Sequence, residues 1–405
     1  MNILLITPSY PNVGNPTEGI FIEQHAIALS NLGHLITVVV CKPWIPSTIA
    51  KLLKQYNSLS HLPKFANINN IDIYFARYLH IPKYHFISTT IMSCYDAIIR
   101  SLTSDKIKRS FDFIQIHGTW PTGLAAPMIS KSLSCPYIVT AHIQDDPRLF
   151  NSRNIELYYK MFEKAYAIVA VGTPIVNHFN RFTKLLKNKI ITIHNGVDID
   201  FIKNATINIP ANYQEWGRIV TVANLWPLKG IDLVLQALGN LKDQGIEWLD
   251  YTIVGEGPEK QSLKSLAKDL KISNRVRFLG RLNHNETLKE IARADIFCMP
   301  SWQEAFGVVY LEAMALGKPV IGCFGQGSED IFKHEREGLL VKPKDADGLA
   351  DALKRLINQP SFSKSLGSAG RFRAQQFTWE RNAKQYQELY QKCLSQMFSF
   401  HNQLN

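Results

Sequence analysis

The chain has 405 residues, with 45 Lys and Arg against 34 Asp and Glu and a formal net charge of +11. Hydrophobic residues make up 46% and charged residues 20%, which is typical of a globular protein and excludes a disordered chain. None of the six cysteines belongs to a CxxC pair, which excludes a zinc finger and favours a reducing, cytoplasmic compartment. The first residues, MNILLITPSYP, predict a buried strand rather than a signal peptide because Pro8 and Pro11 interrupt the apolar run.

Short apolar runs alternate with helical patterns along the whole chain. The predicted strands are 2–7, 35–41, 113–117, 137–141, 167–171 and 190–193, followed by 218–223, 250–254, 276–279, 295–299 and 319–322. The predicted helices include 20–32, 121–133, 230–243, 259–270, 307–316 and 345–357. Such alternation favours parallel sheets covered by helices on both faces, and two series of strands predict an α/β protein of two doubly wound domains.

We place the domain boundary after Asp198, because residues 199–217 show no clear period and contain Pro210, which is typical of a linker. The predicted domains are therefore 1–198 and 199–378. A last helix at about 379–397 is expected to pack back on the first domain. Because ligands of doubly wound sheets bind at the carboxyl ends of the strands, the cleft between the domains is the expected site.

The positive charge is concentrated in residues 42–110, which hold 10 Lys and Arg against 3 Asp and Glu, interleaved with aromatic residues. One interpretation is docking on an anionic lipid surface, where each cation contributes ~1 kcal/mol. The other is a solvated basic face above core aromatics, and the sequence leaves both open. Nucleic acid is not an expected partner, because no long basic run or RNP-like motif is present.

The densest group of candidate functional residues lies at 301–322. Glu304 is expected in the loop after a strand and Glu312 in the following helix, where two carboxylates can accept hydrogen bonds from sugar hydroxyls. Gly307 permits close approach of the backbone to a ligand, and the helix N-terminus offers N–H groups to an anion. The alternative interpretation is an amphipathic helix with solvated glutamates.

The string E-A-F-G-x-x-x-x-E-A-M-A-x-G-K-P-V at 304–320 resembles the signature of glycosyltransferase family 4. These are retaining enzymes of the GT-B fold, with two facing Rossmann-like domains and a cleft between them. The resemblance extends over nearly the whole chain except about 42–110. It includes V-A-N-L-x-P-x-K-G-I-D at 222–232, V-G-E-G-P at 254–258, N-G-V-D at 195–198, H-G-T-W-P-T-G-L-A-A at 117–126 and T-A-H-I-Q-D at 140–145.

The resemblance implies that residues 199–378 bind a nucleotide sugar. Glu312 matches the carboxylate that binds the ribose hydroxyls, Glu304 the one that contacts the transferred sugar, and Lys229 the lysine that offsets charge on the departing diphosphate. Further donor contacts are assigned to Gly19, Asn224, Arg281, Phe306, Gly307 and Val308. Asn224 stands where the family commonly has an arginine, which removes a bidentate phosphate ligand.

In the first domain, His142 resembles the family's histidine near O6 of the donor sugar, and we group it with Glu304 and Lys229 as catalytic. A structural histidine is the alternative for that position. His117 and Trp120 lie in the preceding motif and are assigned to the acceptor side.

The resemblance implies transfer of a hexose, with retention, from a UDP-sugar or alternatively a GDP-sugar to a saccharide acceptor, expected to be lipid-diphosphate-linked. We expect the protein to act in the assembly of cell-surface polysaccharide. We expect it to be cytoplasmic and to bind peripherally to the inner face of the membrane. No cofactor and no metal are expected. A nucleotide-sugar epimerase and an inactive sugar- or lipid-binding protein remain alternatives. A dehydrogenase is disfavoured because Lys260 stands where GxGxxG requires its third glycine.

Overall fold

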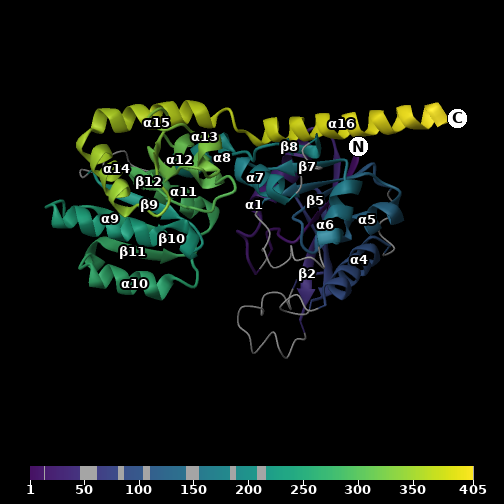
Figure 1. Ribbon diagram of the computed structural model, residues 1–405, viewed down its shortest axis with the longest axis horizontal. Coiled ribbons are helices and arrows are strands. Elements are labelled where there is room, and N and C mark those ends of the chain that lie inside the picture. The colour runs from purple at the N-terminus through teal and green to yellow at the C-terminus, as the bar shows by residue number, and fades with distance from the viewer. Residues whose placement is uncertain are drawn as a thin grey trace. The chain divides into compact units, whose positions relative to one another are not determined.

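The computed structural model describes residues 1–12, 14–45, 62–80, 86–103, 110–142, 155–182, 188–207 and 216–404. The chain divides into two compact units (Figure 1). The N-terminal unit comprises Met1–Val171, Ile175–His194 and Trp379–Asn405, and the C-terminal unit comprises Gly172–Pro174 and Asn195–Thr378. The predicted α/β architecture of two parallel-sheet domains is confirmed.

The N-terminal unit contains an eight-stranded sheet in the order β3-β4-β2-β1-β5-β6-β7-β8, parallel except for the antiparallel β3–β4 pair. Its strands are β1 (Asn2–Thr7), β2 (Leu35–Trp44), β3 (Phe65–Ile68), β4 (Ile71–Leu79), β5 (Phe113–His117), β6 (Tyr137–Ala141), β7 (Ala167–Ala170) and β8 (Ile190–Thr192). The described helices of this unit are α1 (Ile20–Asn31), α4 (Ile87–Thr103), α5 (Thr122–Leu133), α6 (Ile155–Lys164), α7 (Thr173–Phe182) and α16 (Trp379–Leu404). Central strands such as β5 and β6 are buried at every residue, as expected of strands covered by helices on both faces.

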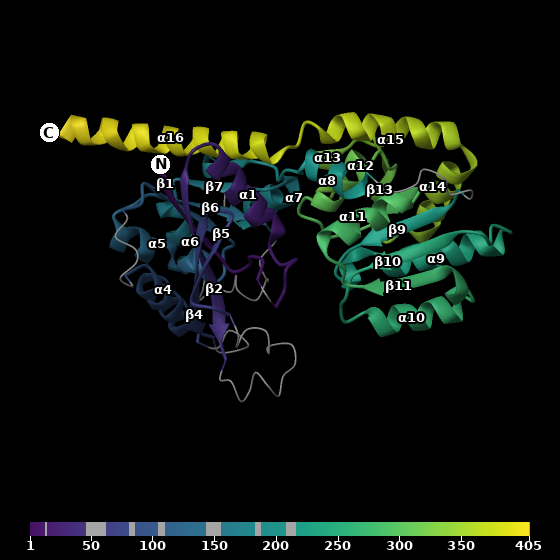
Figure 2. The same cartoon turned by 180° about the vertical axis from the view of Figure 1, so that it is seen from behind.

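The C-terminal unit contains a six-stranded, wholly parallel sheet in the order β11-β10-β9-β12-β13-β14 (Figure 2). Its strands are β9 (Arg218–Val222), β10 (Asp250–Val254), β11 (Val276–Gly280), β12 (Ile296–Cys298), β13 (Val320–Cys323) and β14 (Leu339–Val341). Its helices are α8 (Ile199–Thr206), α9 (Ile231–Asp243), α10 (Lys260–Asp269), α11 (His284–Arg293), α12 (Val308–Ala315), α13 (Ser328–Ile331), α14 (Ala346–Asn358) and α15 (Pro360–Ala374), with 3-10 turns η5 (Pro227–Lys229) and η6 (Ser273–Arg275).

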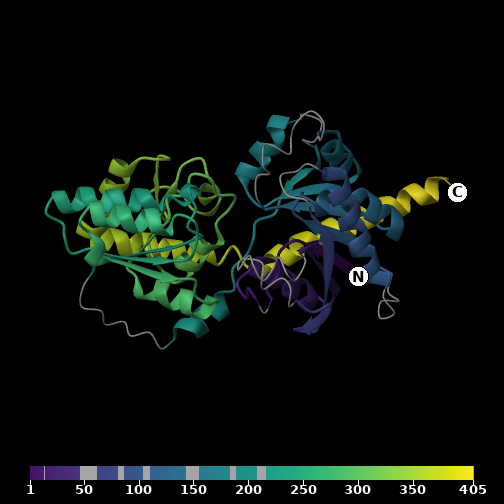
Figure 3. The ribbon, with the colours of Figure 1, turned by 90° about the horizontal axis from the view of Figure 1, so that it is seen from below.

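The last helix, α16, lies along the N-terminal unit in all three ribbon views (Figures 1, 2 and 3). Trp379, Tyr386 and Tyr390 on one face of α16 belong to the same buried core as Ile3 of β1 and Ala26 of α1. These aromatic residues are seven and four residues apart, which places their side chains on one side of a helix. The chain therefore returns to its first unit after completing the second.

The structure begins the C-terminal unit at Asn195 rather than after Asp198. The Val197 amide donates to the Phe377 carbonyl at 2.8 Å, which ties this segment to the connection between α15 and α16. The prediction of a linker is wrong for residues 199–206, which form α8: the Asp198 carboxylate caps the helix by accepting from the Phe201 amide at 2.9 Å. The segment 208–215 lies outside the described residues.

Candidate active site

Lys229 and Glu304 form a half-buried ion pair in the C-terminal unit, although 75 residues separate them. Lys229 Nζ donates to Glu304 Oε2 at 2.6 Å, and the two side chains are only 19% and 12% exposed. The loops that carry them are fixed to each other because the Trp302 amide donates to the Leu228 carbonyl at 3.0 Å. A side chain at Gly230 would place its Cβ 2.4 Å from the Pro300 carbonyl oxygen, so this close approach requires glycine.

The segment from Glu304 to Val308 leads into the N-terminus of α12. The Glu304 carbonyl accepts from the Gly327 amide at 3.0 Å, and Gly307 adopts φ 93° as the N-cap residue. Val308 is the first helical residue, so the amides at this helix start can bind an anion. The Phe306 ring is buried and packs on Phe377 with ring centroids 6.0 Å apart. Only the backbone of Phe306 can therefore contact a nucleotide sugar.

Glu312 lies within α12 and is hydrogen-bonded to a residue that the sequence did not single out. His284 Nε2 lies 2.7 Å from Glu312 Oε1, with side chains 24% and 13% exposed. Burial lowers the pKa of His284, but the hydrogen bond and charge of Glu312 together with the charge of Asp198 outweigh it and raise the pKa above its usual value. Sequence reasoning missed His284 because its only signal was its place at the start of α11.

Asn224 and Arg281 follow neighbouring elements of the same sheet. Asn224 comes two residues after β9, Arg281 comes directly after β11, and both are exposed. Lys229 and Glu304 also lie in segments that follow strands, β9 and β12. Because the strands are parallel, all four residues belong to the carboxyl edge of this sheet, where doubly wound proteins bind ligands.

Two of the predicted residues of the N-terminal unit, His117 and His142, contact each other at the carboxyl ends of β5 and β6. Their Nδ1 and Nε2 atoms are 2.8 Å apart, and the rings stack with centroids 5.1 Å apart at 13°. Burial lowers the pKa of His117 well below its usual range, assisted by the charges of His142 and His25, and burial lowers the pKa of His142 to about 3. Both imidazoles are therefore neutral at pH 7, and one of them donates to the other.

A third histidine, His25 of α1, lies edge-on to His117 with ring centroids 5.6 Å apart. His25 Nε2 lies 2.9 Å from Gln115 Oε1, and Nδ1 lies 2.7 Å from Asn382 Oδ1 of α16. The sequence did not single out His25, whose only signal was a lone histidine within a predicted helix. Trp120 is half-buried in the turn that follows β5.

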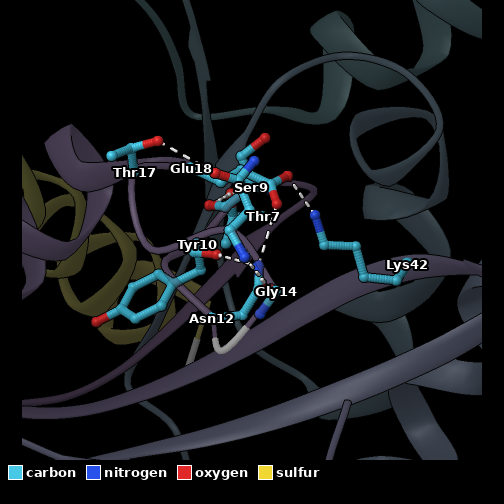
Figure 4. A network of polar contacts seen from close by, with 9 residues as sticks. Thr7, Ser9, Tyr10, Asn12, Gly14, Thr17, Glu18 and Lys42 are labelled. Carbon is cyan, nitrogen blue, oxygen red and sulfur yellow. Dashed lines mark hydrogen bonds and ion pairs between the residues drawn. The ribbon is translucent and has the colours of Figure 1, made fainter. Parts of the chain in front are cut away.

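Gly19 is the N-cap residue of α1 with φ 68°, and an added Cβ would lie 2.6 Å from the Ser9 carbonyl oxygen. Figure 4 shows the polar network that shapes the loop before it. Asn12 Nδ2 donates to Glu18 Oε2 at 3.1 Å, and the buried Lys42 of β2 pairs with the other carboxylate oxygen of Glu18. This network holds the loop against β1, so that Gly19 can present only backbone atoms to a ligand.

The predicted residues thus fall into two sets, one in each unit.

Within the described ranges, no three His, Cys, Asp or Glu side chains gather closely enough to hold a metal ion. Across the same ranges, every helix is too short or too polar to cross a bilayer.

Known proteins resemble the chain over most of its length. It is 26% identical to TuaC of Bacillus subtilis strain 168, provisionally named a teichuronic acid biosynthesis glycosyltransferase, over 96% of this chain and 98% of that one. The sucrose-phosphate synthase of Thermosynechococcus elongatus superposes with a TM-score of 0.77 at 20% identity, covering 98% of this chain and 99% of that one. Anabaena HepE in complex with UDP superposes with a TM-score of 0.70 at 19% identity, covering 97% and 100%.

Two sequence families match consecutive parts of the chain. Residues 19–201 match Glycosyltransferase Family 4, and residues 203–373 match Glycosyl transferases group 1. The two matches correspond to the two units, and the structural neighbours share the same pair of parallel-sheet domains. The chain therefore belongs to the family 4-like, group 1 glycosyltransferases of the GT-B fold.

Proposed function

We propose that this glycosyltransferase moves a hexose from a UDP-sugar, or alternatively a GDP-sugar, to a lipid-linked saccharide with retention of the anomeric configuration and without a metal ion. The observation that carries the proposal is the Lys229–Glu304 pair at the carboxyl edge of the C-terminal sheet, with Glu312 in the helix that follows Glu304. A cation suits a diphosphate, and two carboxylates suit the hydroxyls of a sugar and a ribose.

The donor preference draws support from a structural neighbour. Anabaena HepE has been solved with UDP and with UDP-glucose. In this chain, Lys229 has three N–H donors, so it can bind a phosphate oxygen while it keeps its hydrogen bond to Glu304. The amides at the start of α12 add a second source of positive potential, which partly compensates for Asn224 in place of an arginine.

In the proposed reaction, the bond between the sugar C1 and the diphosphate oxygen breaks as the acceptor oxygen bonds to C1 on the same face. The acceptor proton passes to the departing phosphate oxygen. Lys229 offsets the charge that develops on the diphosphate, and Glu304 orients the sugar and stabilises its oxocarbenium-like state. His142, neutral in its pair with His117, exchanges hydrogen bonds with sugar hydroxyls without adding charge.

The lipid-linked acceptor and the membrane surface draw support from exposed apolar side chains in the N-terminal unit. Trp44 and Leu79 are paired across β2 and β4 at the carboxyl ends of these strands and are 50% and 44% exposed. Phe86 and Met92, at the start of α4, are 56% and 47% exposed. Exposed aromatic and aliphatic side chains in the most basic stretch of the sequence suit an anionic bilayer interface. The name of TuaC supports a role in polysaccharide assembly.

A transfer assay tests the catalytic part of this proposal. Radiolabelled UDP- and GDP-hexoses are incubated with polyprenyl-diphosphate-linked saccharides in vesicles, with and without EDTA, and the product anomer is assigned by NMR. We expect one donor to label the lipid fraction, with retained configuration and no loss of rate in EDTA. An inverted product or a loss of turnover in EDTA contradicts the mechanism, and failure with every donor contradicts the activity.

Flotation with anionic vesicles tests the membrane part. We expect Trp44→Ser to reduce co-flotation several-fold. Leu35→Ser is the matched control, because Leu35 is 58% exposed at the opposite end of the same strand. Equal flotation on anionic and neutral vesicles, or an equal effect of both substitutions, contradicts the proposed surface.

A further inference from the structure

Three helices of the C-terminal unit meet around His284. His284 begins α11, whose N-cap residue Asn283 accepts from the Glu286 amide at 2.8 Å. The imidazole stacks on Phe201 of α8 with ring centroids 5.0 Å apart at 26°. Its Nε2 atom lies 2.7 Å from Glu312 Oε1 of α12. The ring is therefore held on one side by an aromatic face and at its edge by a carboxylate.

The N-G-V-D motif at 195–198 explains how Phe201 reaches this position. The Val197 amide bonds to the Phe377 carbonyl at 2.8 Å, and the Asp198 carboxylate caps α8 through the Phe201 amide at 2.9 Å. The motif thus sets the start of the helix that carries Phe201. Asp198 also acts electrostatically on His284, so the motif supports the imidazole in two ways.

We propose that His284 is a positioning residue for nucleotide recognition: its hydrogen bond to Glu312, with Phe201 stacked on the ring, fixes the carboxylate in the orientation that accepts the ribose hydroxyls. This inference rests on the proposed function, because Glu312 is the proposed ribose ligand.

The physical reason lies in the freedom of a glutamate side chain. Glutamate loses more rotamer entropy on being ordered than most side chains, so a carboxylate that is already fixed binds a ligand at lower cost. A hydrogen bond between an imidazole N–H and a carboxylate is directional and strong. Because each carboxylate oxygen can accept more than one hydrogen bond, Oε1 can serve both His284 and a hydroxyl while Oε2 serves a second hydroxyl.

Isothermal titration calorimetry of the full chain tests the inference with two probes: UDP and a 2′,3′-dideoxy analogue that lacks both ribose hydroxyls. The same pair of guanosine compounds is used if the wild type binds GDP instead. We expect His284→Ala to weaken binding of the nucleoside diphosphate about tenfold and to leave binding of the dideoxy analogue nearly unchanged. The preference of the wild type for the hydroxylated ligand should therefore shrink in the variant.

Two further variants separate positioning from folding. His284→Gln keeps an N–H donor near the position of Nε2 and should restore most of the affinity and of the preference for ribose. Lys289→Ala is the matched control, because it removes an exposed ion pair of the same helix, Lys289 with Glu286 at 2.8 Å, and should change neither quantity.

The outcomes are distinct. Wild-type affinity and ribose preference in His284→Ala overturn the inference, and so does an equal loss for both probes, which would show a structural effect that does not pass through the hydroxyls. Failure of the wild type to bind UDP or GDP contradicts the proposed function itself. Failure of His284→Gln to recover any affinity also overturns the hydrogen-bond role.

Discussion

The polar groups at the carboxyl ends of the strands differ in kind between the two units. In the C-terminal unit, Glu304 and Glu312 each bind a basic side chain from another segment, Lys229 and His284. In the N-terminal unit, the corresponding groups are imidazoles whose pKa values burial lowers, so they are neutral at pH 7. Pairs of a carboxylate with a basic side chain suit a diphosphate and a ribose, whereas neutral imidazoles suit sugar hydroxyls. The proposed function accordingly places the groups that would stabilise charge during the reaction in the C-terminal unit.

The largest effect is expected from Glu304→Gln. The variant keeps the shape of the side chain but removes the negative charge opposite Lys229. We expect turnover to fall by about 10²–10³, the range typical of losing one group that stabilises developing charge, while UDP affinity changes by less than about threefold. Initial rates and calorimetry on one preparation separate the two quantities. Weaker UDP binding at wild-type turnover would reverse the assignment of Glu304.

Lys229→Ala tests whether the charge of this unit is directed at phosphate. We expect the affinity for UDP to fall about 10- to 100-fold, because a charge-assisted hydrogen bond is lost and Glu304 is left without its cation. The affinity for uridine, which lacks the diphosphate, should stay the same. Lys384→Ala is the control, because it removes an exposed ion pair of α16. Equal losses for UDP and uridine would rule out a phosphate contact.

His117→Asn tests the neutral state of the N-terminal histidines. Unfolded histidine titrates near 6.5, and the pKa of His117 in the folded chain lies well below its usual range. The unfolded state therefore binds more protons than the folded state below pH 6.5. The contribution of His117 to the free energy of unfolding is complete above that pH and is lost as the pH falls toward the folded pKa. The loss is at most ~1.4 kcal/mol per pH unit for this group.

Between pH 7 and pH 5, the wild type should consequently lose about 1–2 kcal/mol more unfolding free energy than His117→Asn. Denaturant unfolding at each pH gives the two slopes, and comparing slopes removes any constant destabilisation by the substitution. Parallel slopes would mean that His117 takes up protons in the folded chain as readily as in the unfolded chain, which would contradict its burial in the neutral form.

The smallest effect is expected from Asn224→Arg, which adds a cation at the exposed position after β9. A guanidinium can bind phosphate through two parallel hydrogen bonds, so UDP should bind about three- to tenfold more tightly. Uridine provides the comparison ligand. Unchanged or weaker UDP binding would show that Asn224 does not face the diphosphate.

The apolar strands were the most predictable part of the fold. The bounds of β1, β5, β6 and β10 agree with the sequence, because each is a short run of buried apolar residues between polar segments. The short β14 was not predicted, since its three residues cannot be distinguished from a loop by periodicity. Nor was α8, because its start depends on the Asp198 cap rather than on an apolar pattern.

The candidate site was predictable as a set of residues but not as a set of contacts. Glu304 and Lys229 were each indicated by a motif, yet their ion pair depends on the close packing of Gly230 on Pro300. His284 and His25 had no motif of their own, because their roles arise from neighbours distant in the sequence, Glu312 and Asn382. Tertiary packing determines such partners, and no local pattern encodes them.

The measurement that tests the central claim most directly is titration calorimetry of UDP and of GDP, without added metal, on the wild type and on Glu312→Ala. The account predicts that the wild type binds one of the two nucleotides and that the substitution weakens this binding about tenfold or more, because the proposed ribose ligand is removed. Wild-type affinity in Glu312→Ala would contradict the account, since the nucleotide would then be held elsewhere.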